Sequence, residues 1–232
     1  MPIDISIHLK ILREKITEVA LSCDRDPKMI HLIAVSKTKP VENILMALKT
    51  GQVDFGENYV QEFEKKYLSL EMQAIRWHFI GHLQSNKAKD IIGRAHLIHT
   101  LDRMSLAKKI EKLCDEKSFV QKCLVEVKLS EEESKSGCPE SQVFDFVKKL
   151  AAFDHIDILG LMMIGTHTDD KDITRAEFKK LRELRDALNE KKLYRHALTE
   201  LSMGMSSDFT IAIEEGATLL RIGTEIFGER SP

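Results

Sequence analysis

The chain of 232 residues is long enough for one large α/β domain or two small domains. Its formal net charge of −2 provides no basic field that would attract nucleic acid or an anionic membrane. No apolar run approaches the roughly 20 residues needed to cross a bilayer, and the first residues lack a signal-peptide pattern. Four separated cysteines without a C-x-x-C pair argue against a zinc site or a disulfide framework. We therefore expect a cytoplasmic protein that binds neither membrane nor nucleic acid.

Strand-like and helix-like segments alternate along the chain. A first amphipathic helix is predicted over residues 7–21. Short runs rich in β-branched and aliphatic residues predict strands at residues 32–35, 53–55, 75–80, 97–100, 120–129, 156–164, 198–201 and 218–222. Amphipathic patterns between them predict helices at residues 40–48, 60–70, 87–92, 105–115, 141–152, 173–188 and 211–215.

This alternation favours an α/β fold in which eight parallel strands close into a TIM-type (β/α)8 barrel, rather than an open sheet. The prediction is a single domain over residues 1–232 with an extra N-terminal helix. Right-handed crossovers would bring the carboxyl ends of all strands to one face. The segments expected there are residues 37, 58, 84–86, 163–167, 202–207 and 221–224.

Lys37 directly follows the first predicted strand, at the face where α/β proteins gather their ligands. A lysine partly shielded from water has a lowered pKa, and its neutral amine can form a Schiff base with a carbonyl. A solvated loop lysine is the alternative. That second interpretation is the one we keep for Lys39, which lies two residues further along the loop.

Two loops at the same face suit a phosphate group. Ser206 and Ser207 precede a predicted helix, and Gly223 and Thr224 follow the last strand. In TIM barrels the loops after strands seven and eight commonly hold phosphate, because backbone N–H groups and a helix N-terminus point at it. Helix capping by the serines and a plain turn at Gly223 are the alternative.

An amine on one side of the barrel mouth and a phosphate site on the other suit a phosphorylated aldehyde. Pyridoxal 5'-phosphate fits that description. Arg221, at the end of the last strand, is placed to reach its ring nitrogen. An arginine there donates a hydrogen bond but does not readily give up its proton, so the ring stays a poor electron sink.

Two histidine pairs invite comparison with metal sites: His78 with His82, and His96 with His99. No carboxylate motif accompanies them, and the first pair lies on a strand and its loop, where residues i and i+4 do not share a face. Hydrogen-bonding or packing histidines are the preferred interpretation, and we expect no metal. The glutamate run at residues 131–133 is expected to be solvated surface.

Seven stretches closely resemble the pyridoxal phosphate homeostasis proteins, the YggS/PROSC family. They are AVSKTKP (34–40), FGENYVQE (55–62), WHFIG (77–81), LQSNK (83–87), SKSG (134–137), LSMGMS (201–206) and RIGTEIFG (221–228). The resemblance implies a barrel like the N-terminal domain of alanine racemase, with pyridoxal phosphate held as an internal aldimine. It further implies that Lys37 forms the Schiff base, Arg221 faces the ring nitrogen, and Asn58 lies near the cofactor. Ser206, Gly223 and Thr224 would hold the phosphate.

The resemblance also implies a carrier that buffers pyridoxal phosphate and hands it to apo-enzymes, rather than an enzyme. A two-base racemase needs a second acid/base, which alanine racemases take from an extra C-terminal domain of the partner subunit. This chain stops after the barrel, and Tyr59, the one tyrosine near a strand end, is expected to pack. The alternative is a pyridoxal phosphate-dependent racemase or related enzyme with Lys37 as its single base. We expect a monomer.

Overall fold

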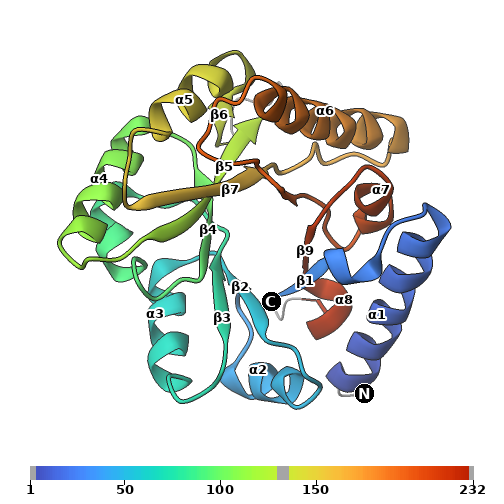
Figure 1. Cartoon of the computed structure of the whole chain (residues 1–232). Coiled ribbons are helices and arrows are strands. Elements are labelled where there is room, and N and C mark those ends of the chain that lie inside the picture. Colours follow the sequence, from blue (N-terminus) through green and yellow to red (C-terminus); the bar gives the residue numbers. More distant parts are fainter. Residues whose placement is uncertain (1–3, 130–135, 230–232) are drawn as a thin grey trace.

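The computed structural model describes residues 4–129 and 136–229, in which parallel strands close into a barrel surrounded by helices (Figure 1). The strands pair in the order β4-β3-β2-β1-β9-β8-β7-β5, and β4 pairs with β5 to close the ring. The ring consists of β1 (His31–Val35), β2 (Asp54–Glu57), β3 (Arg76–Phe79), β4 (Leu97–Leu101), β5 (Gln121–Lys128), β7 (Ile156–Met162), β8 (Glu200–Ser202) and β9 (Leu219–Ile222). The predicted TIM-type (β/α)8 barrel is confirmed.

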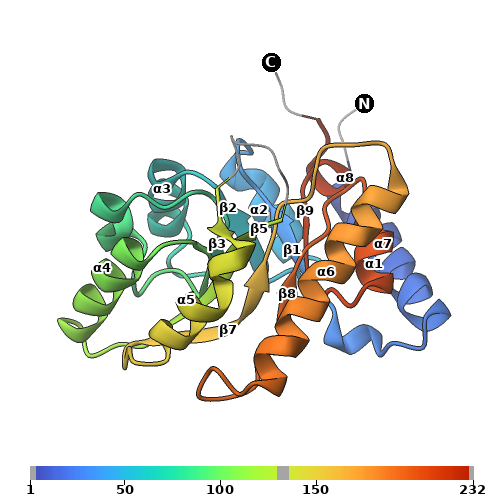
Figure 2. The ribbon, with the colours of Figure 1, turned by 90° about the horizontal axis from the view of Figure 1, so that it is seen from above.

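Helices cover the outside of the ring, and Figure 2 shows α8 at one end of the barrel beside β9. The helices are α1 (Ile5–Ser22), α2 (Val41–Leu48), α3 (Val60–Ser69), α4 (Met104–Asp115), α5 (Val143–Leu150), α6 (Lys171–Glu190), α7 (Phe209–Glu214) and α8 (Thr224–Phe227). Short 3-10 helices are η1 (Pro27–Met29), η2 (Ser85–Asp90) and η3 (Glu140–Gln142). Within the described ranges, no helix has the length and apolar character that crossing a membrane requires.

The extra N-terminal helix is present as α1. It begins at Ile5, two residues before the predicted start, because the Asp4 carboxylate accepts hydrogen bonds from the Ser6 amide (3.0 Å) and the Ile7 amide (3.3 Å). The buried face of α1 comprises Ile5, Leu9, Leu12, Ile16, Val19 and Ala20. It packs against α2, α7 and α8, and so covers the part of the barrel near β1 and β9.

Three segments differ from the predicted elements. The helix expected at residues 87–92 is the tighter η2, which ends before Gly93 with its positive φ of 79°. A two-residue strand, β6 (Cys138–Pro139), pairs with β5 outside the ring. The one-turn helix α8 follows β9, because the Gly223 carbonyl accepts hydrogen bonds from the next turn. The acidic run at residues 131–133 lies outside the described residues.

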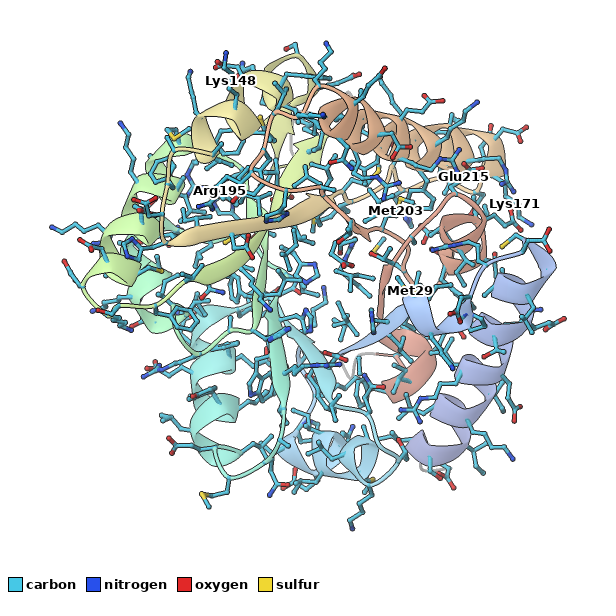
Figure 3. All side chains as sticks on the ribbon, viewed as in Figure 1. Met29, Lys148, Lys171, Arg195, Met203 and Glu215 are labelled. Atoms are coloured by element: carbon cyan, nitrogen blue, oxygen red, sulfur yellow. The ribbon has the colours of Figure 1, made fainter. Side chains whose placement is uncertain are left out.

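Apolar side chains pack on both sides of the strands, as their alternating orientation requires. The interior of the barrel holds a small cluster of Ile33, Leu97, Leu124, Met162 and Leu219. A larger core lies between the strands and the helices. Figure 3 shows the contrast between the buried Met203 and charged side chains such as Lys148 and Lys171, which point outward.

Aromatic side chains join α3 to the outer face of the sheet. Phe63 of α3 is fully buried, and its ring centroid lies 5.8 Å from that of Trp77 and 6.2 Å from that of Phe79. Both contacts are edge-to-face, the arrangement that aromatic quadrupoles favour. Because α3 follows β2 directly, this contact also fixes where the loop between them lies.

We predict that Phe63→Ala lowers the free energy of unfolding by about 3–5 kcal/mol, since it leaves a cavity beside the rings of Trp77 and Phe79. Urea unfolding followed by circular dichroism would measure this change. The matched control is Leu68→Ala in the same helix, where the side chain is 57% exposed. It should change stability by about 0.5 kcal/mol or less, and equal losses for the two variants would contradict the packing described here.

Candidate functional site

A cavity of about 690 Å³ opens at the carboxyl ends of the strands. It collects residues from the strands β1 and β9 and from the loops after β1, β2, β3, β7, β8 and β9. Its walls are Val35, Lys37, Asn58, Ile80, Ile164, His167, Met205, Ser206, Ser207, Arg221, Gly223, Thr224 and Glu225. All six residues to which the sequence assigned a cofactor role are among them, brought together from four separate parts of the chain.

A buried ion cluster braces the loop that carries Lys37. Lys66 of α3 is 5% exposed, and its Nζ donates to Glu57 Oε1 (2.8 Å) and Glu62 Oε1 (2.7 Å). The same Nζ donates to the Ser36 carbonyl at 2.6 Å, and the Ser36 hydroxyl donates to Glu57 Oε1 at 2.6 Å. Burial raises the pKa of the Glu57 carboxyl, and Lys66 opposes that rise. Ser36 is therefore fixed from two sides, directly before Lys37.

The other side of the same loop is also held. Thr38 has a positive φ of 64°, a conformation that is uncommon for a residue with a β-branched side chain. Its amide donates to Glu62 Oε1 at 2.6 Å. The turn that presents the half-buried Lys37 is thus anchored on both neighbours by the carboxylates that hold Lys66.

Arg221 enters the cavity from β9 and is 5% exposed. Its Nη1 donates to the Ser202 hydroxyl at 2.7 Å, and its Nη2 donates to the Met163 carbonyl at 2.8 Å. Burial lowers the pKa of Arg221 to about 10, while Asp208 and Glu126 act in the opposite direction. The guanidinium is therefore charged at neutral pH, and its anchors leave it donors for a ligand.

The two predicted phosphate loops follow the neighbouring strands β8 and β9, and both line the cavity. Ser206 and Ser207 form the turn before α7, and Gly223 and Thr224 form the start of α8. Helix starts leave N–H groups without an intrahelical partner. A Cβ at Gly223 would come within 3.1 Å of the Val35 carbonyl oxygen, so a side chain there would require the backbone to shift by a few tenths of an ångström.

Asn58 contributes a buried acceptor. Among the described residues its Oδ1 accepts no hydrogen bond although it is shielded from solvent. Gly81 makes this placement possible, because a Cβ there would lie 2.0 Å from the Asn58 carbonyl oxygen. A buried acceptor without a partner costs free energy, which a donor on a bound ligand would recover.

Sequence reasoning assigned no role to the apolar walls of the cavity, Val35, Ile80, Ile164 and Met205, or to His167. Most lie in segments that were expected at this face, and their position just after strand ends was the available signal. The loop with Ile164 and His167 is held by Glu177 of α6, which accepts from the Thr166 amide (2.8 Å) and hydroxyl (2.5 Å).

The expectation that Tyr59 packs is wrong. Its side chain is 56% exposed, and with Asn58 it lines a separate cavity of about 200 Å³. The reason is its position as the residue before α3, where the backbone is extended and Phe63, one turn later, fills the buried face.

Glu126 of β5 is a buried carboxyl, 3% exposed, whose Oε2 accepts no hydrogen bond among the described residues. Burial raises its pKa to about 7, Asp102 adds to the rise, and Arg221 and Arg103 oppose it. Its neutral form is therefore well populated at neutral pH. This feature lies beside the guanidinium of the site and could not be inferred from a lone glutamate in a strand.

We predict that Lys66→Met lowers the free energy of unfolding by about 3–5 kcal/mol, because it leaves the Glu57 charge buried without its partner. The double variant Glu57→Gln, Lys66→Met should recover part of the loss. Chemical denaturation measures both. The exposed Lys65→Met in the same helix is the control, and a loss in Lys66→Met no larger than in this control would contradict a stabilising ion cluster.

A second prediction concerns pH. The pKa of Glu126 is raised to about 7 in the folded state from 4.5, so the stability contributed by its neutral form is complete below pH 4.5 and is lost as the pH rises through 7. In Glu126→Gln the side-chain amide does not titrate. The free energy of unfolding of this variant, relative to that of the unsubstituted protein, should therefore increase by up to about 3 kcal/mol between pH 4.5 and about pH 7.

Denaturation midpoints at a series of pH values would measure this difference, with the exposed Glu71→Gln as control. Parallel stability curves for Glu126→Gln and the unsubstituted protein would show that Glu126 titrates normally.

Comparison with known proteins gives a consistent set of matches. The family described as "Alanine racemase, N-terminal domain" matches residues 7–231. A protein of Aquifex aeolicus named "Pyridoxal phosphate homeostasis protein" is 43% identical over 223 residues, which cover 96% of this chain and 97% of that protein. A protein of the same name from Escherichia coli is 36% identical and covers 98% of this chain and 97% of its own length.

Solved structures agree with these matches. PipY of Synechococcus elongatus, in a structure described as having PLP bound, superposes with a TM-score of 0.86 at 34% identity, over 97% of this chain and all of PipY (100%). Alanine racemase of Clostridium difficile superposes with a TM-score of 0.70 at 15% identity, over 97% of this chain but 56% of the racemase. The second likeness concerns the fold alone.

Proposed function

Because the chain belongs to the family of the pyridoxal phosphate homeostasis proteins, we propose that it binds pyridoxal phosphate at the barrel mouth. It holds the cofactor as an internal aldimine on Lys37 and serves in its intracellular buffering and delivery, without efficient turnover. The observation that carries this proposal is the single cavity that joins Lys37, Asn58 and Arg221 to the loops at Ser206 and Thr224.

The residues of the cavity suit the cofactor chemically. The aldehyde group of the cofactor forms a Schiff base with an amine. Lys37 supplies that amine from a loop held by the buried ion cluster around Lys66. Ser206, Gly223 and Thr224 supply hydroxyl groups and helix-start amides for a phosphate. The unpartnered Asn58 Oδ1 is an acceptor for a ligand donor, and the apolar side chains of Val35, Ile80, Ile164 and Met205 give a ring-shaped ligand a dry wall.

Arg221 favours retention of the cofactor over turnover. A pyridine ring acts as an electron sink when its nitrogen is protonated. With a pKa of about 10, Arg221 stays charged and donates a hydrogen bond to the ring nitrogen without transferring its proton. A ring held in this way stabilises developing negative charge poorly, which suits a carrier that releases the cofactor intact.

The racemase alternative requires a proton donor or acceptor on each face of a bound amino acid. Among the described residues that line the cavity there is no tyrosine, and the exposed Tyr59 belongs to the neighbouring cavity. Besides Lys37, the acid/base side chains that line the cavity are His167 and Glu225, so racemisation here would use Lys37 as a single base or pair it with one of these. Apo-enzymes that need pyridoxal phosphate are the partners that the carrier function requires.

We predict that the protein with added pyridoxal phosphate shows a visible aldimine absorption band, and that Lys37→Ala abolishes it. Borohydride reduction followed by peptide mapping should place the adduct on Lys37. Lys39→Ala is the matched control, because Lys39 lies in the same loop and its Nζ donates to the Glu229 carbonyl instead. A band that persists in Lys37→Ala, or an adduct on another lysine, would refute the assignment.

Turnover is tested with the same preparations. The carrier function predicts that the loaded protein does not exchange the α-proton of amino acids with solvent at a catalytic rate. Exchange that is catalytic and depends on Lys37 would replace the carrier by the racemase alternative.

A further inference from the structure

A chain of polar side chains runs through the interior of the barrel beneath Arg221. Its first member is the Ser202 hydroxyl, which Arg221 contacts at 2.7 Å. Ser202 Oγ lies 2.8 Å from His99 Nδ1, and His99 Nε2 lies 3.0 Å from His78 Nδ1. His78 Nε2 lies 3.0 Å from Asp54 Oδ1. The histidine pairs suggested by sequence proximity thus do not form, and His78 pairs with His99 across neighbouring strands.

The far end of this chain lies at the opposite face of the barrel. Asp54 and Arg76 are the first residues of β2 and β3, and their side chains form a two-point ion pair, with Arg76 Nε 2.7 Å from Asp54 Oδ1. Arg76 is exposed there. We call the five side chains of Arg221, Ser202, His99, His78 and Asp54 the interior relay. It connects the cavity to an ion pair at the amino ends of the strands.

The two ends of the interior relay fit one direction for all of its hydrogen bonds when both histidines are neutral. Arg221 can only donate, so the single proton of the Ser202 hydroxyl is free to go to His99 Nδ1. His99 must then carry its own proton on Nε2 and donate it to His78 Nδ1. His78 likewise carries its proton on Nε2 and donates it to the Asp54 carboxylate. With both histidines neutral, every contact of the interior relay pairs one donor with one acceptor. The alternative is a doubly protonated His78 that donates to His99 Nε2 as well as to Asp54, and it would place an imidazolium in the barrel interior.

Burial fits this arrangement. His99 and Ser202 are fully buried and His78 is 3% exposed, so an imidazolium in either position would be poorly solvated. Desolvation lowers the pKa of both histidines. A TIM barrel interior is normally filled by branched apolar side chains. The interior relay instead shares that space with the cluster around Ile33 and Leu97, and chains of buried hydrogen bonds polarise one another.

We propose that the interior relay is a positioning device for the cofactor ring, in which Ser202, His99, His78 and Asp54 hold Arg221 in one orientation as a permanent donor. This inference rests on the proposed function for its consequence but not for its geometry. Arg221 alone touches the ligand. The other four residues act through it, because His99 accepts the Ser202 proton and so orients a lone pair of the Ser202 hydroxyl toward Arg221.

The geometry is tested without any cofactor, by 15N NMR of the histidine side chains in the unloaded protein. Both His78 and His99 should be neutral near pH 7 and protonated on Nε2. An imidazolium, or a proton on Nδ1 of either ring, would overturn the direction of the interior relay. Because this readout needs no ligand, it decides the proposal even if the protein does not bind pyridoxal phosphate.

The consequence is tested by comparing cofactor affinity in Ser202→Ala and a matched control. Thr100→Val is that control, since Thr100 lies beside His99 on β4, is buried, and bonds to the Gly81 carbonyl instead of the interior relay. Ser202→Ala should still form the Lys37 adduct. Its dissociation constant for pyridoxal phosphate should be about 10-fold higher or more, as expected for a lost hydrogen bond to a charged group. The control should stay within about 2-fold.

A second pair of variants separates the loss of hydrogen bonds from a general effect of substituting a buried residue on folding. His99→Asn places an acceptor near the position of Nδ1 and should retain more affinity than His99→Phe, which removes both bonds of the ring. Equal affinity in Ser202→Ala and the unsubstituted protein, or equal affinity in the two His99 variants, would overturn the positioning role. Absence of a Lys37 adduct in the unsubstituted protein would instead refute the proposed function.

Discussion

A guanidinium buried inside the barrel is the constraint on which this site depends. Removing a charge from water is costly unless hydrogen bonds replace its hydration. Arg221 meets that condition through the Ser202 hydroxyl and the Met163 carbonyl, which come from two other strand ends. The barrel must therefore close with β7, β8 and β9 in one relative position. The result is a cavity whose base carries a fixed positive charge.

The amine side of the cavity is built by the same means. The loop after β1 packs against the buried ion cluster of Lys66, Glu57 and Glu62. Hydrogen bonds from this cluster to Ser36 and Thr38 fix the turn. Both ends of the ligand site are thus set by buried polar contacts within the protein. Such a site is organised before the ligand arrives, which lowers the ordering cost of binding.

The sequence was sufficient for the architecture because alternation of short apolar runs and amphipathic segments is a local signal. Position after a strand end likewise singled out Lys37 and Thr224, which line the cavity. The ion cluster was hidden because Lys66 is one charged residue among many in an amphipathic helix. The interior relay was hidden because His78 and His99 meet only through the pairing of β3 with β4. Tyr59 was misjudged since helix starts do not reveal which residues face solvent.

Under the function proposed above, a charged Arg221 keeps the ring nitrogen of bound pyridoxal phosphate unprotonated, so that the protein holds the cofactor without using it. The most direct measurement is 15N NMR of the protein loaded with cofactor labelled at that nitrogen. We expect the chemical shift of a neutral pyridine that accepts a hydrogen bond, unchanged across neutral pH. A pyridinium shift would show that the ring is an active electron sink, and would contradict this role of Arg221.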